Sequence, residues 1–298
     1  MFTIATDHLS AVINPLGAEL THLRDPAGRE LMTDADPAFW TGHAPILFPI
    51  VGALNGGTYR LGDQQYALPQ HGLARKLPFE LVAQDAASVT LRLTDSDATR
   101  PAYPFAFALD VTHAITGATL TTTVAVTNCG EGDMPASIGF HPAFAWPLPY
   151  GQARADHRIV FERDEPARLS RIMAGGLIGP ADRDAPIEAR TLALHDDLFA
   201  VDALVWETIE SQSVRYGAAK GPQLRIDFPG TPMLGIWSKP GAAFVCVEPW
   251  HGIADPQGFT GEIWDKPGMM RLAPGETRAV AMAVTLEAQP LSTTVIPA

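Results

Sequence analysis

The sequence is poor in cysteine and in positive charge. Only two cysteines occur among 298 residues, Cys129 and Cys246, so neither a disulfide framework nor a cysteine-based zinc site is indicated. Lys and Arg number 21 against 33 Asp and Glu, giving a formal net charge of -12. This argues against a nucleic-acid surface, because neutralising phosphates requires clustered positive charge. The composition predicts a small or neutral partner and a reducing, cytoplasmic environment.

Long apolar runs are missing as well. No window approaches the roughly 18 uninterrupted apolar residues of a membrane span, and the N-terminus lacks the basic and apolar regions of a signal peptide. We therefore expect a soluble, unprocessed protein with no membrane partner. No nucleophile elbow, phosphate loop, dinucleotide fingerprint or helical pair of zinc-binding histidines occurs, so no cofactor is expected.

The sequence is rich in alternating apolar and polar residues, a pattern typical of strands with one buried face. This alternation covers residues 89–93, 105–111, 120–126, 224–228 and 280–286. The best helical window, residues 34–40, allows one or two turns where Asp precedes Pro. We therefore predict an all-β fold, a large antiparallel β-sandwich in which residues 1–298 form a single domain.

Three ionisable residues lie in apolar or turn-rich surroundings. His71 occurs in PQHG, His141 ends a run of small residues in GFHPAF, and Glu248 ends the apolar run in FVCVEPWHG. Turn residues follow at once or nearly so, and turns are where a sandwich presents side chains to a cleft. An ionised carboxylate buried without partners costs several kcal/mol, so Glu248 at the end of a buried strand needs hydrogen-bond donors or a function.

Two histidines and a glutamate are the residue types of an acid/base set. Histidine titrates near neutrality, and burial can raise the pKa of a glutamate toward the same range. Structural roles stay open: His71 or His141 could be an ordinary satisfied histidine, and Glu248 could pair with an arginine. Among the tryptophans, which mostly suit the core, Trp250 is the one expected in a turn at the cleft, where its ring could stack on a sugar.

Several segments run through the chain in the order HAPILFPIVG, YALPQHGLAR, SIGFHPAF, LGIWSKP, FVCVEPWHGIAD, WDKPG and LAPGE. In this order they resemble the aldose 1-epimerase (galactose mutarotase-like) family, in particular its less characterised cytoplasmic branch. The resemblance covers most of the chain and is weakest over residues 151–190. It implies a large antiparallel β-sandwich with a sugar site in a cleft on one sheet.

The resemblance also implies roles for individual residues. Glu248 would be the general base on the anomeric hydroxyl and His141 the general acid toward the ring oxygen, with a neighbouring carboxylate raising the pKa of His141. His71 would hold and polarise the sugar near that oxygen. An aspartate that binds a sugar hydroxyl is expected in the region of Asp202.

One departure from the family pattern concerns Ala53, where relatives commonly carry an arginine. His43 and Arg75 are candidates for the missing donor. Arg75 with Lys76 is also the basic pair that a phosphorylated sugar would require. The substrate is therefore open between a hexose or related aldose and a hexose phosphate.

We expect a cofactor-independent mutarotase with a small-molecule sugar as its partner; no feature specifies an oligomeric state. A non-catalytic carbohydrate-binding protein on the same fold is the alternative. A glycosidase using Glu248 and Asp255 would need two carboxylates about 5 to 9.5 Å apart across a bond. A zinc site made of His71, His141 and Glu248 is chemically permissible, but the resemblance speaks against it, and no metal is expected.

Overall fold

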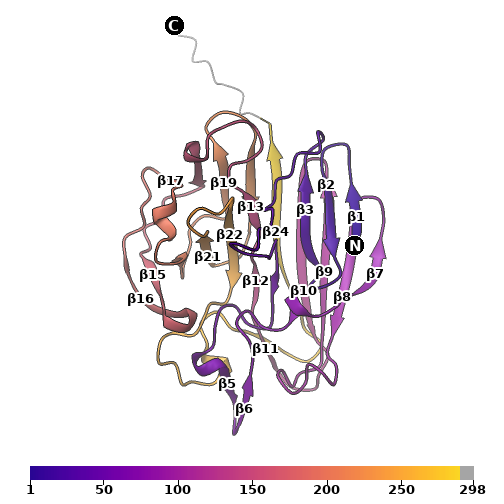
Figure 1. Cartoon of the computed structure of the whole chain (residues 1–298). Coiled ribbons are helices and arrows are strands. Elements are labelled where there is room, and N and C mark those ends of the chain that lie inside the picture. The colour runs from indigo at the N-terminus through magenta and orange to yellow at the C-terminus, as the bar shows by residue number, and fades with distance from the viewer. Residues whose placement is uncertain (289–298) are drawn as a thin grey trace.

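The computed structural model describes residues 1–288 and forms a β-sandwich, as predicted (Figure 1). The rear layer is a nine-stranded sheet, and an eight-stranded sheet continued by a three-stranded sheet forms the front layer. All pairs of named strands are antiparallel. The prediction of an antiparallel all-β fold is therefore confirmed.

The strands of each sheet are given in their spatial order. The rear sheet contains β17 (Thr191–Ala193), β14 (His157–Phe161), β19 (Ser213–Ala218), β20 (Gln223–Asp227), β24 (Thr277–Glu287), β10 (Thr119–Asn128), β9 (Phe107–Thr116), β8 (Ser88–Thr94) and β7 (Glu80–Gln84). The eight-stranded sheet contains β16 (Leu177–Arg183), β15 (Leu169–Met173), β18 (Leu204–Trp206), β21 (Met233–Trp237), β22 (Phe244–His251), β12 (Ile138–Phe140) and β4 (Ile46–Leu47), with β13 (Ala143–Ala145) also paired to β22.

Smaller elements complete the sandwich. The three-stranded sheet consists of β1 (Phe2–Ala5), β2 (Ser10–Asn14) and β3 (Glu19–Arg24). Two further pairs are β5 (Thr58–Leu61) with β6 (Gln64–Ala67), and β11 (Met134–Ala136) with β23 (Met270–Leu272). Within residues 1–288 the helices are short 3-10 turns, η1 (Asn55–Gly57), η2 (Ala74–Lys76), η3 (Arg154–Asp156), η4 (Ala174–Gly176), η5 (Asp196–Phe199) and η6 (Ile263–Asp265).

The five alternating segments of the sequence correspond to strands of the rear sheet, β8, β9, β10, β20 and β24, except that residues 105, 106 and 228 lie just outside β9 and β20. In β10, buried and partly exposed residues alternate along the whole strand, because one face packs on the core and the other meets water. Threonines pair across its outer face: Thr119 bonds Thr285 and Thr127 bonds Thr277, each at 2.8 Å between the hydroxyl oxygens. Such cross-strand pairs help to fix the register of the sheet.

Of the one or two helical turns predicted for residues 34–40, a single turn forms. The Asp36 carboxylate accepts the amide of Ala38 at 2.8 Å, and the Asp36 carbonyl accepts the amide of Trp40 at 3.0 Å. The chain then leaves the helical path, and no helix is assigned there. This turn brings Trp40 to the cavity on the outer face of the eight-stranded sheet.

The two layers enclose a large apolar core. Strands of the rear sheet contribute Leu91, Val111, Val124 and Val284, and strands of the front layer contribute Ile13, Leu23, Leu234, Val245 and Val247. Alternate residues of β22 point the other way, because successive side chains of a strand face opposite sides of the sheet. Phe244 and Cys246 pack in one outer cluster and Trp250 in another, leaving Glu248 between them.

Glu248 does not end its strand, contrary to the prediction. β22 continues through Pro249 and Trp250 to His251 and pairs with β21 from Cys246 to Trp250. On its other side β22 pairs first with β13 and then with β12, and the residues between those strands, His141 and Pro142, leave the sheet. Pro249, which has no N–H to donate, lies where β22 changes partner.

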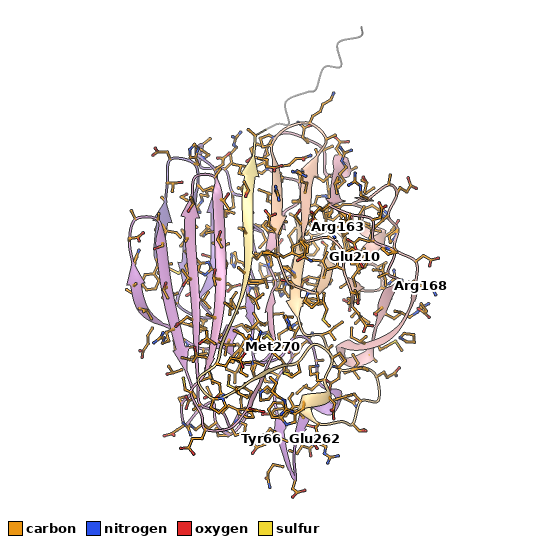
Figure 2. All side chains as sticks on the ribbon, turned by 180° about the vertical axis from the view of Figure 1, so that it is seen from behind. Tyr66, Arg163, Arg168, Glu210, Glu262 and Met270 are labelled. Atoms are coloured by element: carbon orange, nitrogen blue, oxygen red, sulfur yellow. The ribbon has the colours of Figure 1, made fainter. Side chains whose placement is uncertain are left out.

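The hairpin of β5 and β6 projects at the lower end of the molecule (Figure 1). Glu262 fastens it, through an ion pair with Arg60 at 3.3 Å and by accepting the amide of Gly62 at 2.8 Å. Figure 2 labels Tyr66 of the hairpin and Glu262 at this lower end, seen from behind. Across residues 1–288, no helix is both long and apolar enough to cross a membrane.

Candidate active site

A cavity of about 300 Å³ opens on the outer face of the eight-stranded sheet. Every residue predicted for the site lines it: His71, Arg75, His141, Asp202, Glu248 and Trp250. Trp40, Gln70 and Trp237, which sequence reasoning did not place there, line it too, and the poorly matched stretch 151–190 contributes Ile172, Gly176 and Ile178. Side chains far apart in the sequence therefore meet in one hollow large enough for a small molecule.

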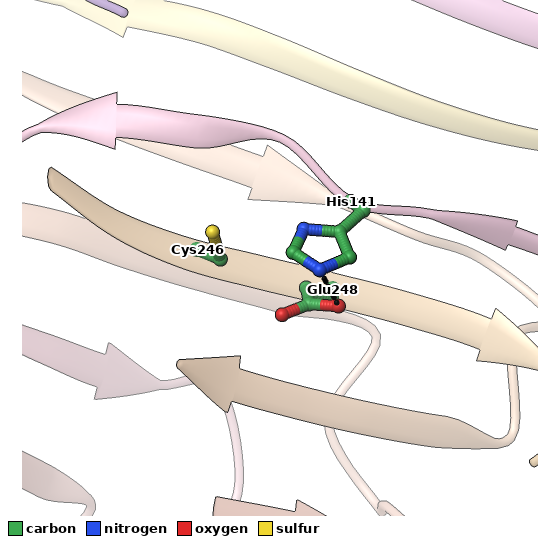
Figure 3. Close-up of side chains that lie close together, drawn as sticks. All are labelled: His141, Cys246 and Glu248. Carbon is green, nitrogen blue, oxygen red and sulfur yellow. Dashed lines mark ion pairs between the residues drawn. The ribbon is translucent and has the colours of Figure 1, made fainter. Parts of the chain in front are cut away.

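His141 and Glu248 are in direct contact at the floor of this cavity. Nε2 of His141 lies 3.2 Å from Oε2 of Glu248, and both side chains are nearly inaccessible, at 11% and 2% exposed (Figure 3). The contact arises because the chain leaves the sheet at His141, directly beside the strand that carries Glu248. The imidazole is thus held over the carboxylate by the break between β12 and β13.

Aromatic rings surround His141. Trp40 stacks on the imidazole with ring centres 4.8 Å apart, while Trp237 and His71 meet it edge-on at 5.7 Å each. Burial among these rings lowers the pKa of His141 to about 3, and the positive charge of Arg75 adds to this lowering. The expectation that a neighbouring carboxylate would raise this pKa is wrong, because burial of the ring dominates and Glu248 is itself shifted toward its uncharged form.

The pKa of Glu248 is shifted in the opposite direction. Burial raises it well above its usual range, and the negative charge of Asp202 raises it further. The indole N–H of Trp250 offsets part of this rise, although the Trp250 nitrogen makes no hydrogen bond of normal geometry. Burial therefore favours the uncharged form of each group, a protonated carboxyl for Glu248 and a neutral imidazole for His141.

Because burial lowers the pKa of His141 and raises the pKa of Glu248, the two side chains share one proton. A second proton would put a net positive charge in the apolar cavity, and loss of the proton would put a net negative charge there, so burial disfavours both changes. Moving the proton from Glu248 to His141 changes neither the proton count nor the net charge. The pair can therefore convert between its neutral and ionic forms across a contact of 3.2 Å.

His71 lines the cavity, and its Nε2 lies 3.3 Å from the side-chain amide of Gln70, which also lines it. Its Nδ1 accepts the amide of Gly52 at 3.1 Å, which fixes the neutral ring with its proton on Nε2. Burial, followed by the charges of His141 and Arg75, lowers the pKa of His71 well below its usual value, so the ring is neutral near pH 7. Its backbone has a φ of 65°, a left-handed conformation in which histidine is enriched among non-glycine residues.

Arg75 is the cationic group of the cavity wall. Its Nη2 donates to the carbonyl of Gln70 at 3.0 Å, whereas its Nε is buried and has no hydrogen-bond partner. Ala53 is buried and does not line the cavity itself, but a Cβ at Gly176 in the cavity wall would lie 3.5 Å from the Ala53 Cβ. His43, the other candidate for the missing arginine, does not line the cavity.

Trp250 lies in strand β22 and not in a turn, contrary to the prediction, yet it does face the cavity. Its ring fits between two neighbouring strands because both carry glycine there. A Cβ at Gly235 would lie 2.4 Å from the Trp250 ring, and one at Gly139 would lie 2.9 Å from it. The two glycines thus make room for a flat aromatic surface beside Glu248.

Asp202 and Asp255 differ in position. Asp202 is exposed at the edge of the cavity, and one of its carboxylate oxygens accepts the amide of Ala203 at 2.7 Å. Asp255 instead lies outside the cavity in a buried ion pair with Lys266 at 2.7 Å, and it accepts the amide of Asn55 at 2.9 Å. The second carboxylate of the glycosidase interpretation is therefore not available opposite Glu248.

The potential metal ligands also differ from the predicted set. His141 and Glu248 are grouped with Cys246, whose sulfur lies within 4.8 Å of a ligand atom of each, and His71 is not in this group (Figure 3). Burial, with a smaller contribution from Glu248, raises the pKa of the Cys246 thiol well above its usual value. The signal for Cys246 was present in the sequence, because a residue two positions before Glu248 on a strand shares its face.

A β-sandwich whose outer cavity is lined by tryptophans and a histidine–glutamate pair is the architecture of a protein that binds a small molecule with flat apolar faces and polar groups. The family model of aldose 1-epimerase matches residues 1–284. The chain belongs to the aldose 1-epimerase family, in agreement with the resemblance seen in its sequence.

Relatives and solved structures agree with this assignment. Protein LacX (chromosomal) of Lactococcus lactis subsp. lactis is 32% identical over 293 residues, covering 95% of this chain and 98% of that protein. A galactose mutarotase related enzyme from Lactobacillus acidophilus has a TM-score of 0.88 at 31% identity, covering 97% of each chain. A galactose mutarotase-like protein from Lactobacillus casei has a TM-score of 0.86 at 31% identity, covering 96% of this chain and 100% of that one. Together they support a sugar mutarotase type of function.

Proposed function

We propose that the protein is a mutarotase that interconverts the α and β anomers of an aldose, with Glu248 and His141 as its base and acid. The observation that carries the proposal is the 3.2 Å contact between these groups in the cavity. The anomeric hydroxyl and the ring oxygen of a pyranose are bonded to the same carbon, so an acid and a base that serve them must lie in the same small cavity, as these two groups do. Complementary proton-transfer groups have no use in a protein that only binds sugar.

The reaction begins with the pair in its ionic form. Bound sugar favours this form, because its anomeric hydroxyl donates to the Glu248 carboxylate and its ring oxygen accepts from the His141 imidazolium. Glu248 takes the hydroxyl proton while His141 gives its proton to the ring oxygen, and the bond between C1 and that oxygen breaks. Rotation about C1–C2 exposes the other face of the aldehyde. Reclosure with the transfers reversed gives the other anomer and restores the pair.

The remaining cavity residues bind the sugar. His71 donates from Nε2, Asp202 accepts from a hydroxyl, and Trp250 offers a flat face to the C–H groups of the ring. Arg75 favours a second candidate substrate, a sugar phosphate, because its guanidinium lines the cavity and its Nε has no partner. The sugar panel below therefore includes hexose phosphates beside neutral aldoses.

The test compares anomer exchange in wild type, Glu248→Gln and His141→Asn, measured by NMR saturation exchange over the panel. We expect each substitution to slow exchange by at least about a hundredfold, the usual contribution of a positioned acid or base. Glu210→Gln and His195→Asn make the same chemical changes at exposed positions and should keep the wild-type rate. Full activity in the two cavity variants would contradict the roles. Binding of sugars without any exchange would favour a non-catalytic binding protein.

A further inference from the structure

We propose that His141, Cys246 and Glu248 form a binding site for a thiophilic divalent cation such as Zn²⁺, and that the bound cation inhibits anomer exchange. The binding rests on the side-chain cluster alone, whereas the inhibition rests on the proposed function. A ring nitrogen of His141, the sulfur of Cys246 and a carboxylate oxygen of Glu248 all lie within 4.8 Å of one another (Figure 3). These are three residue types that zinc uses as ligands.

The spacing of the first two ligands already suits the metal. Zinc binds histidine nitrogen and carboxylate oxygen at about 2.0 to 2.2 Å, so two such atoms on a tetrahedral ion lie about 3.3 Å apart. Nε2 of His141 and Oε2 of Glu248 are 3.2 Å apart. Nδ1 of the same ring is buried without a hydrogen-bond partner, so coordination through either nitrogen breaks no other bond of the imidazole.

The third ligand needs only a small adjustment. A sulfur at about 2.3 Å from zinc lies about 3.5 Å from a nitrogen or oxygen ligand, so the 4.8 Å limit on the cluster leaves at most about 1.3 Å to close. Cys246 and Glu248 are alternate residues on one face of β22, so a side-chain rotation can bring the sulfur in without moving the strand. His141 and Glu248 line the cavity, so an ion that enters the cavity reaches two of the three ligands directly, while Cys246 lies buried behind them.

Charge balance favours a dication between His141, Cys246 and Glu248. A thiolate and a carboxylate together carry two negative charges, so the complex with Zn²⁺ has no net charge among Trp40 and Trp237. Two protons leave when it forms, one from the thiol and one from the His141–Glu248 pair. Burial raises the pKa of the thiol, so the metal must displace this proton, as zinc does when it binds cysteine. Both proton-transfer groups are then occupied, and exchange stops.

The experiment uses the Cys129→Ser protein, in which Cys246 is the remaining thiol because the chain has only two cysteines. Zinc is titrated calorimetrically into this protein and into its Cys246→Ala and Cys246→Ser derivatives. We expect one ion per chain, bound at least about a hundredfold more weakly in both derivatives, since losing even an outer-shell partner costs about 10- to 100-fold. Cadmium should give a thiolate charge-transfer absorption only while Cys246 is present. Thermal unfolding checks that each derivative is folded.

Inhibition is measured as the fraction of each variant's own metal-free exchange rate. Zinc should abolish anomer exchange in Cys129→Ser. In the two Cys246 derivatives, half-inhibition should require a zinc concentration at least about a hundredfold higher. The proposal is overturned if zinc shows no saturable binding, or if binding and inhibition are the same without Cys246. Zinc binding in a protein that exchanges no sugar would refute the proposed function and leave the metal site standing. Exchange without zinc binding would refute the metal site alone.

Discussion

His113 is a buried histidine outside the cavity through which pH should act on stability. It is 1% exposed, its Nε2 lies 2.9 Å from the carbonyl of Ala18 and its Nδ1 lies 3.0 Å from the hydroxyl of Thr122. A neutral ring satisfies both contacts, with Nε2–H donating and Nδ1 accepting. Burial lowers the pKa of His113 to about 4, although its bond to Ala18 acts in the opposite direction.

Because the pKa of His113 is lower in the folded chain than in the unfolded chain, its contribution to stability is complete above about pH 6.5 and is lost as the pH falls toward 4. A difference of about 2.5 pH units corresponds to on the order of 3 kcal/mol. We expect the loss of unfolding free energy between pH 7 and pH 5, measured in urea, to be smaller in His113→Gln than in wild type. His195→Asn, at an exposed position, should retain the wild-type loss. Equal losses in all three proteins would contradict the role of His113.

For single residues, the sequence indicates which side chains can take part in a reaction better than it indicates which side chains lie close together. His71, His141 and Glu248 were identified because ionisable groups stand out in apolar segments. Cys246 was dismissed by counting cysteines, although its partners in space are a histidine and a glutamate. Trp40 was missed because it lies about a hundred residues before the ring that it stacks on, and only the folded chain brings the two together.

Among the strands, the contact between β21 and β22 should be the most sensitive to a single methyl group. A Cβ at Gly235 would lie 2.4 Å from the Trp250 ring. We expect Gly235→Ala to lower the free energy of unfolding by about 1 to 3 kcal/mol, the usual cost of overpacking, and to weaken sugar binding by displacing Trp250. Gly132→Ala is the matched control, because nothing lies within 4 Å of a Cβ there. Unchanged denaturation midpoints for Gly235→Ala would show that the ring can move freely.

How well a strand can be predicted depends on how many of its faces are buried. β8, β9, β10, β20 and β24 have one wet face, so alternation marks them in the sequence. In β22 every residue but the last is buried, so no alternation remains to show where the strand ends. Glu248 therefore does not mark the end of the strand, because the cavity accommodates an ionisable side chain in the middle of β22.

For the molecule as a whole, we predict one cooperative unfolding transition. Residues from Ile4 to Val284 join in a single large core, with side chains from both layers of the sandwich, so neither layer can separate without exposing the other. Calorimetric and van't Hoff enthalpies should agree, and far-ultraviolet circular dichroism and tryptophan fluorescence should change together in denaturant. A second transition in either measurement would show that the chain contains more than one folding unit.

Because the cavity lies on the outer face of the eight-stranded sheet, the same strands carry core residues on one face and cavity residues on the other. Inward residues such as Val247 build the interior, and outward residues such as Glu248 shape the hollow. Substitutions at Gly176 or Asp202 would change the outline and the charge of that hollow while removing nothing from the packed core. Sugar preference can thus diverge in proteins of this architecture without their scaffold being rebuilt.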